Sequence, residues 1–147
     1  MQAAALVEQL KQRHPDWRFV GVGSQNSRRV GVSLWADSSL WSIVGITEAF
    51  TRMPRFILDY RKIRQRLLSS RPHLTVFIDS PAVHMRLAPV AQRAGLRCVY
   101  YFPPSGWSQN ARRLRNIHSK AEALIPAFAY SAEQYRKNGL EVAYFGN

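Results

Sequence analysis

Asp79 is the residue whose type and position best suit it to do chemistry. It follows the apolar run 74–78 (LTVFI) and precedes Ser80 and Pro81. A continuous apolar run is typical of a strand covered on both faces, and open α/β sheets bind ligands beyond the carboxyl ends of their strands. A carboxylate there, beside a helix N-terminus, is well placed to act as a general base. The alternative is that Asp79 only caps the helix that follows.

Two turns and one histidine could also contribute to a site. The turn 105–107 (SGW) and the pair Gly146-Asn147 follow predicted strands, as Asp79 does. His84 is either a second titrating group or a surface histidine. The single cysteine, Cys98, and the scattered histidines lack the spacing of metal ligands, and no glycine-rich phosphate loop occurs. We therefore expect no metal and no cofactor.

The segment 50–71 is the most basic part of the chain. It contains six arginines and one lysine against a single acid, Asp59, and its apolar residues recur at helical spacing. Pro54 suits the first position of such a helix. A basic amphipathic helix is typical of a surface that meets anionic lipid headgroups. The alternative is a packed helix whose charged face is only solvated.

Short apolar runs alternate with helical segments along the chain. Helices are expected over 3–13, over 82–94 and from Ser131, which opens a capping box. Residues 24–29 are expected to form a polar loop, and 31–44 an irregular segment. Strands are expected near 18–22, 74–78, 97–102, 123–128 and 141–145. This alternation predicts an α/β fold with a Rossmann-like parallel sheet and flanking helices.

The composition is that of a globular protein with a strong positive charge. Hydrophobic residues make up 46% and charged residues 20% of the 147 residues, which fits one domain with a core. The 21 Lys+Arg against 9 Asp+Glu give a formal net charge of +12. Such a charge predicts a polyanionic neighbour: nucleic acid, an anionic membrane face or phosphorylated substrates. We expect neither a membrane-spanning helix nor a signal peptide, and the lone cysteine fits a reducing cytoplasm.

Five segments in order resemble one known family, the lipid-A-disaccharide synthases. Residues 42–50 (SIVGITEAF) resemble the family's MGxxE segment, which also precedes a basic helix. Residues 77–81 (FIDSP) resemble its GIDxPDFN strand end, and 100–107 (YYFPPSGW) its YxxPSxWAW turn. Residues 19–23 (FVGVG) and 144–146 (YFG) match the flanking strands. The resemblance therefore covers nearly the whole chain.

The resemblance implies a GT-B glycosyltransferase that works without a metal, peripheral on the cytoplasmic face of the inner membrane. Such enzymes join UDP-2,3-diacylglucosamine to 2,3-diacylglucosamine 1-phosphate and release UDP. Both substrates are acylated anions, which would explain the basic helix without nucleic acid as a partner. The implied general base is Asp79. The implied substrate-binding residues are Gly45, Glu48, Ser80, Ser105 and Trp107, and the implied lipid-binding residues are Arg52, Met53, Arg55, Phe56 and Arg61.

The chain also departs from the family pattern. The second aspartate of GIDxPDFN is Ala82 here, and its asparagine is His84. Residues 107–110 (WSQN) stand in place of WAWR, and His73 replaces the usual aspartate of KPD. From the resemblance we expect residues 1–147 to be a truncated acceptor-side half of a GT-B fold, without its first strand and its C-terminal donor domain, and inactive alone. The alternative is a non-catalytic basic module that binds nucleic acid or an anionic protein.

Overall fold

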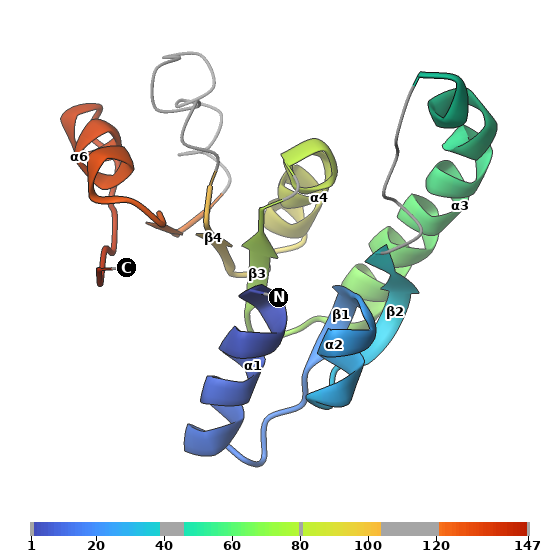
Figure 1. The fold of residues 1–147 in the computed structure, drawn as a ribbon, viewed down its shortest axis with the longest axis horizontal. Coiled ribbons are helices and arrows are strands. Elements are labelled where there is room, and N and C mark those ends of the chain that lie inside the picture. The colour runs from blue at the N-terminus through green and yellow to red at the C-terminus, as the bar shows by residue number, and fades with distance from the viewer. Residues whose placement is uncertain (1, 39–45, 80, 104–120, 147) are drawn as a thin grey trace. The chain divides into compact units, whose positions relative to one another are not determined.

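The computed structural model describes residues 2–38, 46–79, 81–103 and 121–146, except for the side chains of 46–53 and 81–82. These residues form two compact units, 1–69 and 70–147. Figure 1 follows the chain through both units. Parallel strands with helices between them make up each unit, so the predicted α/β, Rossmann-like class is confirmed.

The first unit pairs two parallel strands, β1 (Val20–Gly23) and β2 (Ser33–Asp37). Its helices are α1 (Gln2–Arg13), α2 (Gln25–Arg29) and α3 (Ile46–Ser70). The prediction of an irregular segment over 31–44 was wrong for β2, and the predicted polar loop at 24–29 is mostly the short helix α2. Strand β2 has no alternating apolar pattern, and it forms because it pairs with β1. The register of this pair shifts between Gly21 and Val22.

The second unit holds three parallel strands in the order β3-β4-β5. They are β3 (Thr75–Ile78), β4 (Cys98–Tyr101) and β5 (Ala123–Ile125). Helix α4 (Pro81–Arg93) connects β3 to β4 and packs against β4, and α6 (Ala129–Lys137) follows β5. Helix α4 ends as predicted at Gly95, whose left-handed backbone (φ 70°) lets the N–H of Leu96 bond back to the carbonyl of Ala91.

The buried side chains of the second unit come from its strands and from one face of each helix. Phe77 and Tyr100 are 4% and 3% exposed on β3 and β4, and Leu124 is 3% exposed on β5. The helices add Leu87, Ala91, Ala132 and Tyr135. Burial raises the pKa of Tyr135 to about 12. This core fixes the strands whose ends carry the candidate site.

Three predicted boundaries differ in the structure. Helix α6 begins at Ala129 with Phe128 at its N-cap, not at Ser131, because Ser131 and Ala132 are buried on its inner face. Residues 141–145 do not form a strand, since β5 offers only three residues and Val142 alone bridges to it. Helix α3 begins at Ile46, so Pro54 lies inside it rather than at its start.

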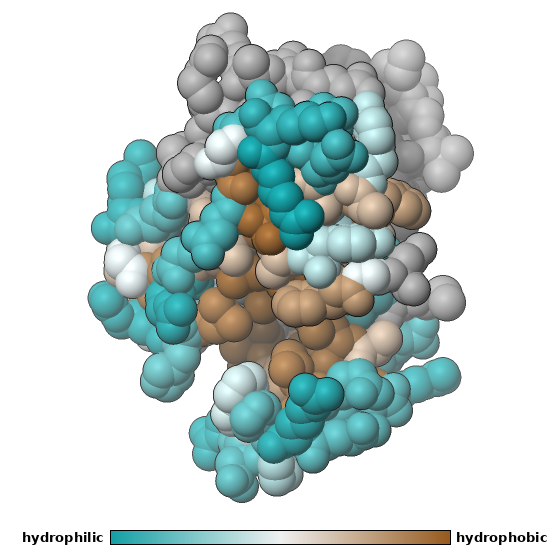
Figure 2. All heavy atoms as spheres, turned by 90° about the vertical axis from the view of Figure 1, so that its left-hand side faces the viewer, coloured by the Kyte–Doolittle hydropathy of each residue, from teal (hydrophilic) through white to brown (hydrophobic). Residues whose placement is uncertain are grey.

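Large hydrophobic side chains are exposed in and near α6. Figure 2 faces the side of Figure 1 on which α6 lies, where hydrophobic side chains are visible among hydrophilic ones. Phe128, Tyr130 and Phe145 are 58%, 56% and 84% exposed, and all three belong to α6 or to segments beside it in sequence. Exposed apolar area of this kind commonly marks a contact with another domain or molecule.

The described core predicts that two leucines of the second unit contribute differently to the free energy of unfolding. Leu124→Ala removes a side chain that is 3% exposed, so we expect the free energy of unfolding to fall by about 2–5 kcal/mol. Leu74→Ala makes the same change at a side chain that is 45% exposed, and we expect a loss below about 1 kcal/mol. Urea denaturation of both variants measures the difference, and equal losses would contradict the described core.

Candidate active site at the carboxyl edge of the sheet

Asp79 lies at the carboxyl edge of the second unit's sheet. It follows the last residue of β3, and the register places Ile78 beside Tyr101 and Tyr101 beside Ile125. The first residues after the three strands, Asp79, Phe102 and Pro126, therefore emerge at one edge. In open parallel sheets this is the edge where ligands bind, as expected from the sequence.

The backbone at this edge turns through an uncommon conformation at two neighbouring strand ends. Asp79 has φ 49° and Phe102 has φ 57°, both in the left-handed region. Hydrogen bonds hold both residues to the next strand: the N–H of Asp79 donates to the carbonyl of Tyr101 (3.2 Å), and that of Phe102 to the carbonyl of Ile125 (2.9 Å). Left-handed residues other than glycine cost about 1–2 kcal/mol each. Such strain is found most often at functional sites.

Two side chains from different elements bind the main-chain carbonyl of Asp79. The hydroxyl of Tyr100, on β4, donates to it at 2.8 Å, and Nδ1 of His84, on α4, lies 2.5 Å from it. A carbonyl oxygen can only accept, so the proton of this second bond belongs to Nδ1 of His84. This arrangement could not be predicted from the sequence, because it depends on where β4 and α4 lie around Asp79.

The imidazole of His84 packs against two aromatic rings. Its centroid is 5.0 Å from that of Phe77 and 5.7 Å from that of Tyr100, with the Tyr100 ring edge-on at 76°. Desolvation lowers the pKa of His84 from 6.5 to about 4, although its hydrogen bond to Asp79 and the charge of Asp79 act in the opposite direction. The pKa of Tyr100 is raised, first by burial and then by the charge of Asp79. Near neutral pH both groups are therefore uncharged donors, and His84 is not the surface histidine considered from the sequence.

The side chain of Asp79 is exposed at this edge. Helix α4 begins at Pro81, two residues after Asp79. A solvent-exposed carboxylate, on a backbone fixed by three hydrogen bonds, can accept a proton from a bound hydroxyl.

Several predicted site residues fall outside what the structure describes. Gly45, Ser80, Ser105 and Trp107 lie outside the described residues. Glu48, Arg52 and Met53 lie in α3, where only the backbone is described. Of the residues predicted to bind substrate or to act in catalysis, Asp79 is thus the one that the structure describes in full.

Helix α3, in the first unit, exposes both charge and apolar area. Arg55 and Arg61 are exposed and Phe56 is partly buried. Ile57 and Leu58 are 44% and 55% exposed. We call these five residues, together with the exposed Arg64, the α3 surface. Among the described helices, none is long and apolar enough to cross a membrane.

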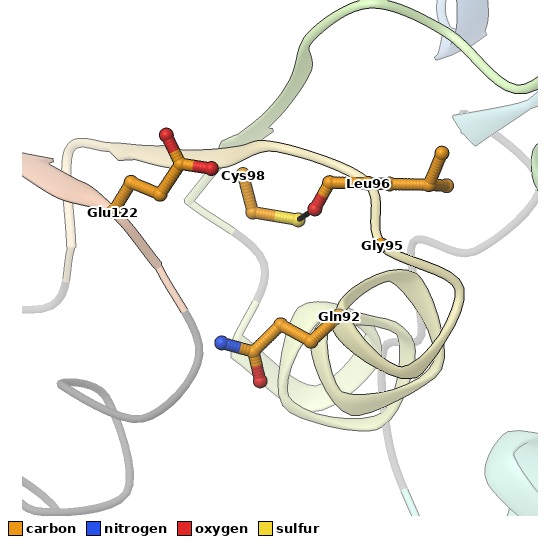
Figure 3. Close-up of a pocket in the computed structure, with 5 residues that line it drawn as sticks. All are labelled: Gln92, Gly95, Leu96, Cys98 and Glu122. Atoms are coloured by element: carbon orange, nitrogen blue, oxygen red, sulfur yellow. Dashed lines mark hydrogen bonds between the residues drawn. The ribbon is translucent and has the colours of Figure 1, made fainter.

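A pocket of about 300 Å³ lies elsewhere in the second unit. Gln92, Gly95, Leu96, Cys98 and Glu122 line it, and Figure 3 shows Gln92 of α4 across from Cys98 of β4. Cys98 is the first residue of β4, so this pocket lies at the amino end of that strand and Asp79 at the opposite edge. Burial, followed by the charge of Glu122, raises the pKa of Cys98 to about 11. A protonated thiol is unreactive, and we do not assign the site to this pocket.

Comparison with known proteins identifies the family. Residues 1–147 match the family model described as lipid-A-disaccharide synthetase. The chain is 30% identical over 144 residues to the lipid-A-disaccharide synthase of Xanthomonas axonopodis pv. citri. The aligned residues make up 98% of the chain and 33% of that protein. It is 31% identical over 146 residues to lipid-A-disaccharide synthase 1 of Legionella pneumophila. The aligned residues make up 99% of the chain and 38% of that protein.

The chain spans only about a third of the length of these curated relatives. The family match nevertheless covers every residue, including the β3 end with Asp79 and the basic helix α3. The resemblance found in the sequence is thereby confirmed, and this chain belongs to the lipid-A-disaccharide synthetase family.

Proposed function

We propose that this chain is the acceptor-side part of a glycosyltransferase of lipid A biosynthesis. The reaction joins UDP-2,3-diacylglucosamine to 2,3-diacylglucosamine 1-phosphate and releases UDP. Family membership over the whole chain supports this proposal, together with a carboxylate at the ligand-binding edge of a parallel sheet. In this proposal a separate donor domain binds the UDP-sugar.

The proposed role of Asp79 is to take the proton from the acceptor's hydroxyl. As that oxygen attacks the anomeric carbon of the donor sugar, the bond from this carbon to the UDP oxygen breaks. The oxygen becomes a better nucleophile as its proton moves to the carboxylate. The observation that carries this role is the exposed carboxylate of Asp79 on a backbone held in a left-handed conformation at the strand end.

The other substrate contacts are assigned from the resemblance. Gly45 precedes the basic helix in sequence and Glu48 lies in its first residues. Ser80 follows β3 in sequence, and Ser105 and Trp107 follow β4. We propose that Ser80, Ser105 and Trp107 contact a sugar bound at Asp79.

We further propose that the α3 surface docks on the anionic cytoplasmic face of the inner membrane. Ile57 and Leu58 offer apolar area, and Arg55, Arg61 and Arg64 offer positive charge. Apolar burial and attraction to anionic headgroups act together in interfacial helices. Arg52 and Met53 precede this surface on the same helix and are proposed to extend it.

The test of Asp79 uses a chimera in which this chain replaces the matching third of an active relative. Asp79→Asn removes the basic oxygen but keeps the shape, and asparagine adopts left-handed backbone readily. We expect kcat to fall by about 10²–10⁴-fold, measured as UDP release, with the melting temperature unchanged. Asp79→Ala is a poorer test because alanine adds backbone strain of about 1–2 kcal/mol. Turnover by Asp79→Asn within about threefold of the parent would exclude general-base catalysis by Asp79.

The test of the α3 surface is co-sedimentation of the chain with anionic liposomes. Replacing Arg55, Arg61 and Arg64 with Glu should weaken binding at least 100-fold, since each basic residue near an anionic surface contributes about 1 kcal/mol.

Charge reversal elsewhere in the same unit provides the matched control. Glutamate at Arg13, Arg28 and Arg29, all exposed on α1 and α2, changes the net charge equally and should leave most of the binding intact. Equal losses in both variants would show that binding follows net charge alone. Strong, salt-sensitive binding to nucleic acid in place of liposomes would favour the basic-module alternative.

A further inference from the structure

The main-chain carbonyl of Asp79 accepts hydrogen bonds from two side chains that have no other role in the proposed reaction. Tyr100 reaches it from β4 and His84 from the first turn of α4. We propose that His84 and Tyr100 are positioning residues, which hold Asp79 in its left-handed conformation and so fix the direction of its carboxylate. This proposal rests on the proposed role of Asp79 as the general base.

The geometry explains why the carbonyl is the group that is held. In a left-handed residue the carbonyl and the side chain point in other directions than they do in an extended residue. If Asp79 returned to an extended conformation, its carbonyl would turn away from both donors and its carboxylate would turn with it. The donors His84 and Tyr100, on separate elements, therefore favour the left-handed backbone of Asp79, and this backbone determines where the carboxylate lies. The N–H of Asp79, bonded to the carbonyl of Tyr101, completes the restraint.

The surroundings of His84 favour the donor form of its ring. Phe77 and Tyr100 lie against the imidazole, and the charge of Asp79 also acts on it. Burial keeps the imidazole neutral, so only one of its two nitrogens carries a proton. The bond to the Asp79 carbonyl places that proton on Nδ1. Nε2 is left as an acceptor.

An asparagine at position 84 could supply the same hydrogen bond as His84. Nδ1 of histidine and Nδ2 of asparagine are both bonded to Cγ, so the two side chains carry an N–H at the same distance from the backbone. Replacement of one by the other preserves a donor to the Asp79 carbonyl.

Kinetics of the chimera test the proposal. His84→Leu keeps an apolar side chain of similar size and removes the donor, and we expect kcat to fall about 10- to 100-fold because a small misplacement of a catalytic group is costly. The KM should change by less than about threefold, since no substrate contact is lost. His84→Asn should rescue kcat to within about threefold of the parent. Tyr100→Phe removes only the hydroxyl and should lower kcat in the same direction.

A spectroscopic readout tests the hydrogen bond from His84 directly. In ¹⁵N NMR of the ¹⁵N-histidine-labelled chain at neutral pH, His84 should be neutral with its proton on Nδ1, whereas free imidazole side chains favour the proton on Nε2. A proton on Nε2, or a charged ring, would overturn the proposal. This measurement does not depend on turnover, so it also stands if Asp79 proves not to be the base.

The kinetic outcomes distinguish the two proposals. If Asp79→Asn is inactive but His84→Leu and Tyr100→Phe keep full kcat, Asp79 remains the base and the positioning role is wrong. The positioning role is also wrong if His84→Asn is as slow as His84→Leu. Should His84→Leu fail to fold, Tyr100→Phe and His84→Asn, which keep the packing or the donor, still decide the question.

Discussion

The hydrogen bonds to the main chain of Asp79 are the interaction on which the candidate site depends. They join three elements at one point: β3, which ends there, β4, which supplies Tyr100, and α4, which supplies His84. Each bond contributes only about 1 kcal/mol to stability, comparable with the strain of a left-handed aspartate. The parallel pairing of β3 with β4 makes these bonds possible, because it brings Phe77 beside Tyr100 and so places the Tyr100 hydroxyl near the carbonyl of Asp79.

The same parallel pairing explains why the site lies where it does. Parallel strands send all their carboxyl ends to one edge, and ligands of open parallel sheets bind beyond that edge. The opposite edge holds the pocket beside Cys98 and the ion pair of Arg97 with Glu122, whose atoms lie 3.1 Å apart. Both partners of that ion pair are largely exposed, so it contributes little to stability. The functional asymmetry of the sheet thus follows from strand direction.

Features encoded in local sequence were predictable, and features that arise from pairing were not. The run 74–78 and the glycine at 95 carry their structure in their own residues, and both β3 and the end of α4 were predicted. Strand β2 was missed because it forms through its pairing with β1. The start of α6 was missed because burial in the core determines it. The position of Asp79 could be predicted from the end of an apolar run. Its left-handed backbone and its two donors could not, since Tyr100 lies 21 residues away in sequence and meets Asp79 only through the sheet.

The central claim is that the carboxylate of Asp79 accepts the acceptor's proton, and chemical rescue tests it most directly. Asp79→Gly deletes the carboxylate, and glycine adopts the left-handed backbone without strain, so the strand end keeps its shape around a vacant space. Added formate, a small carboxylate that fits such a space, should restore UDP release in the chimera as its concentration rises. Full turnover by Asp79→Gly without formate would contradict the account.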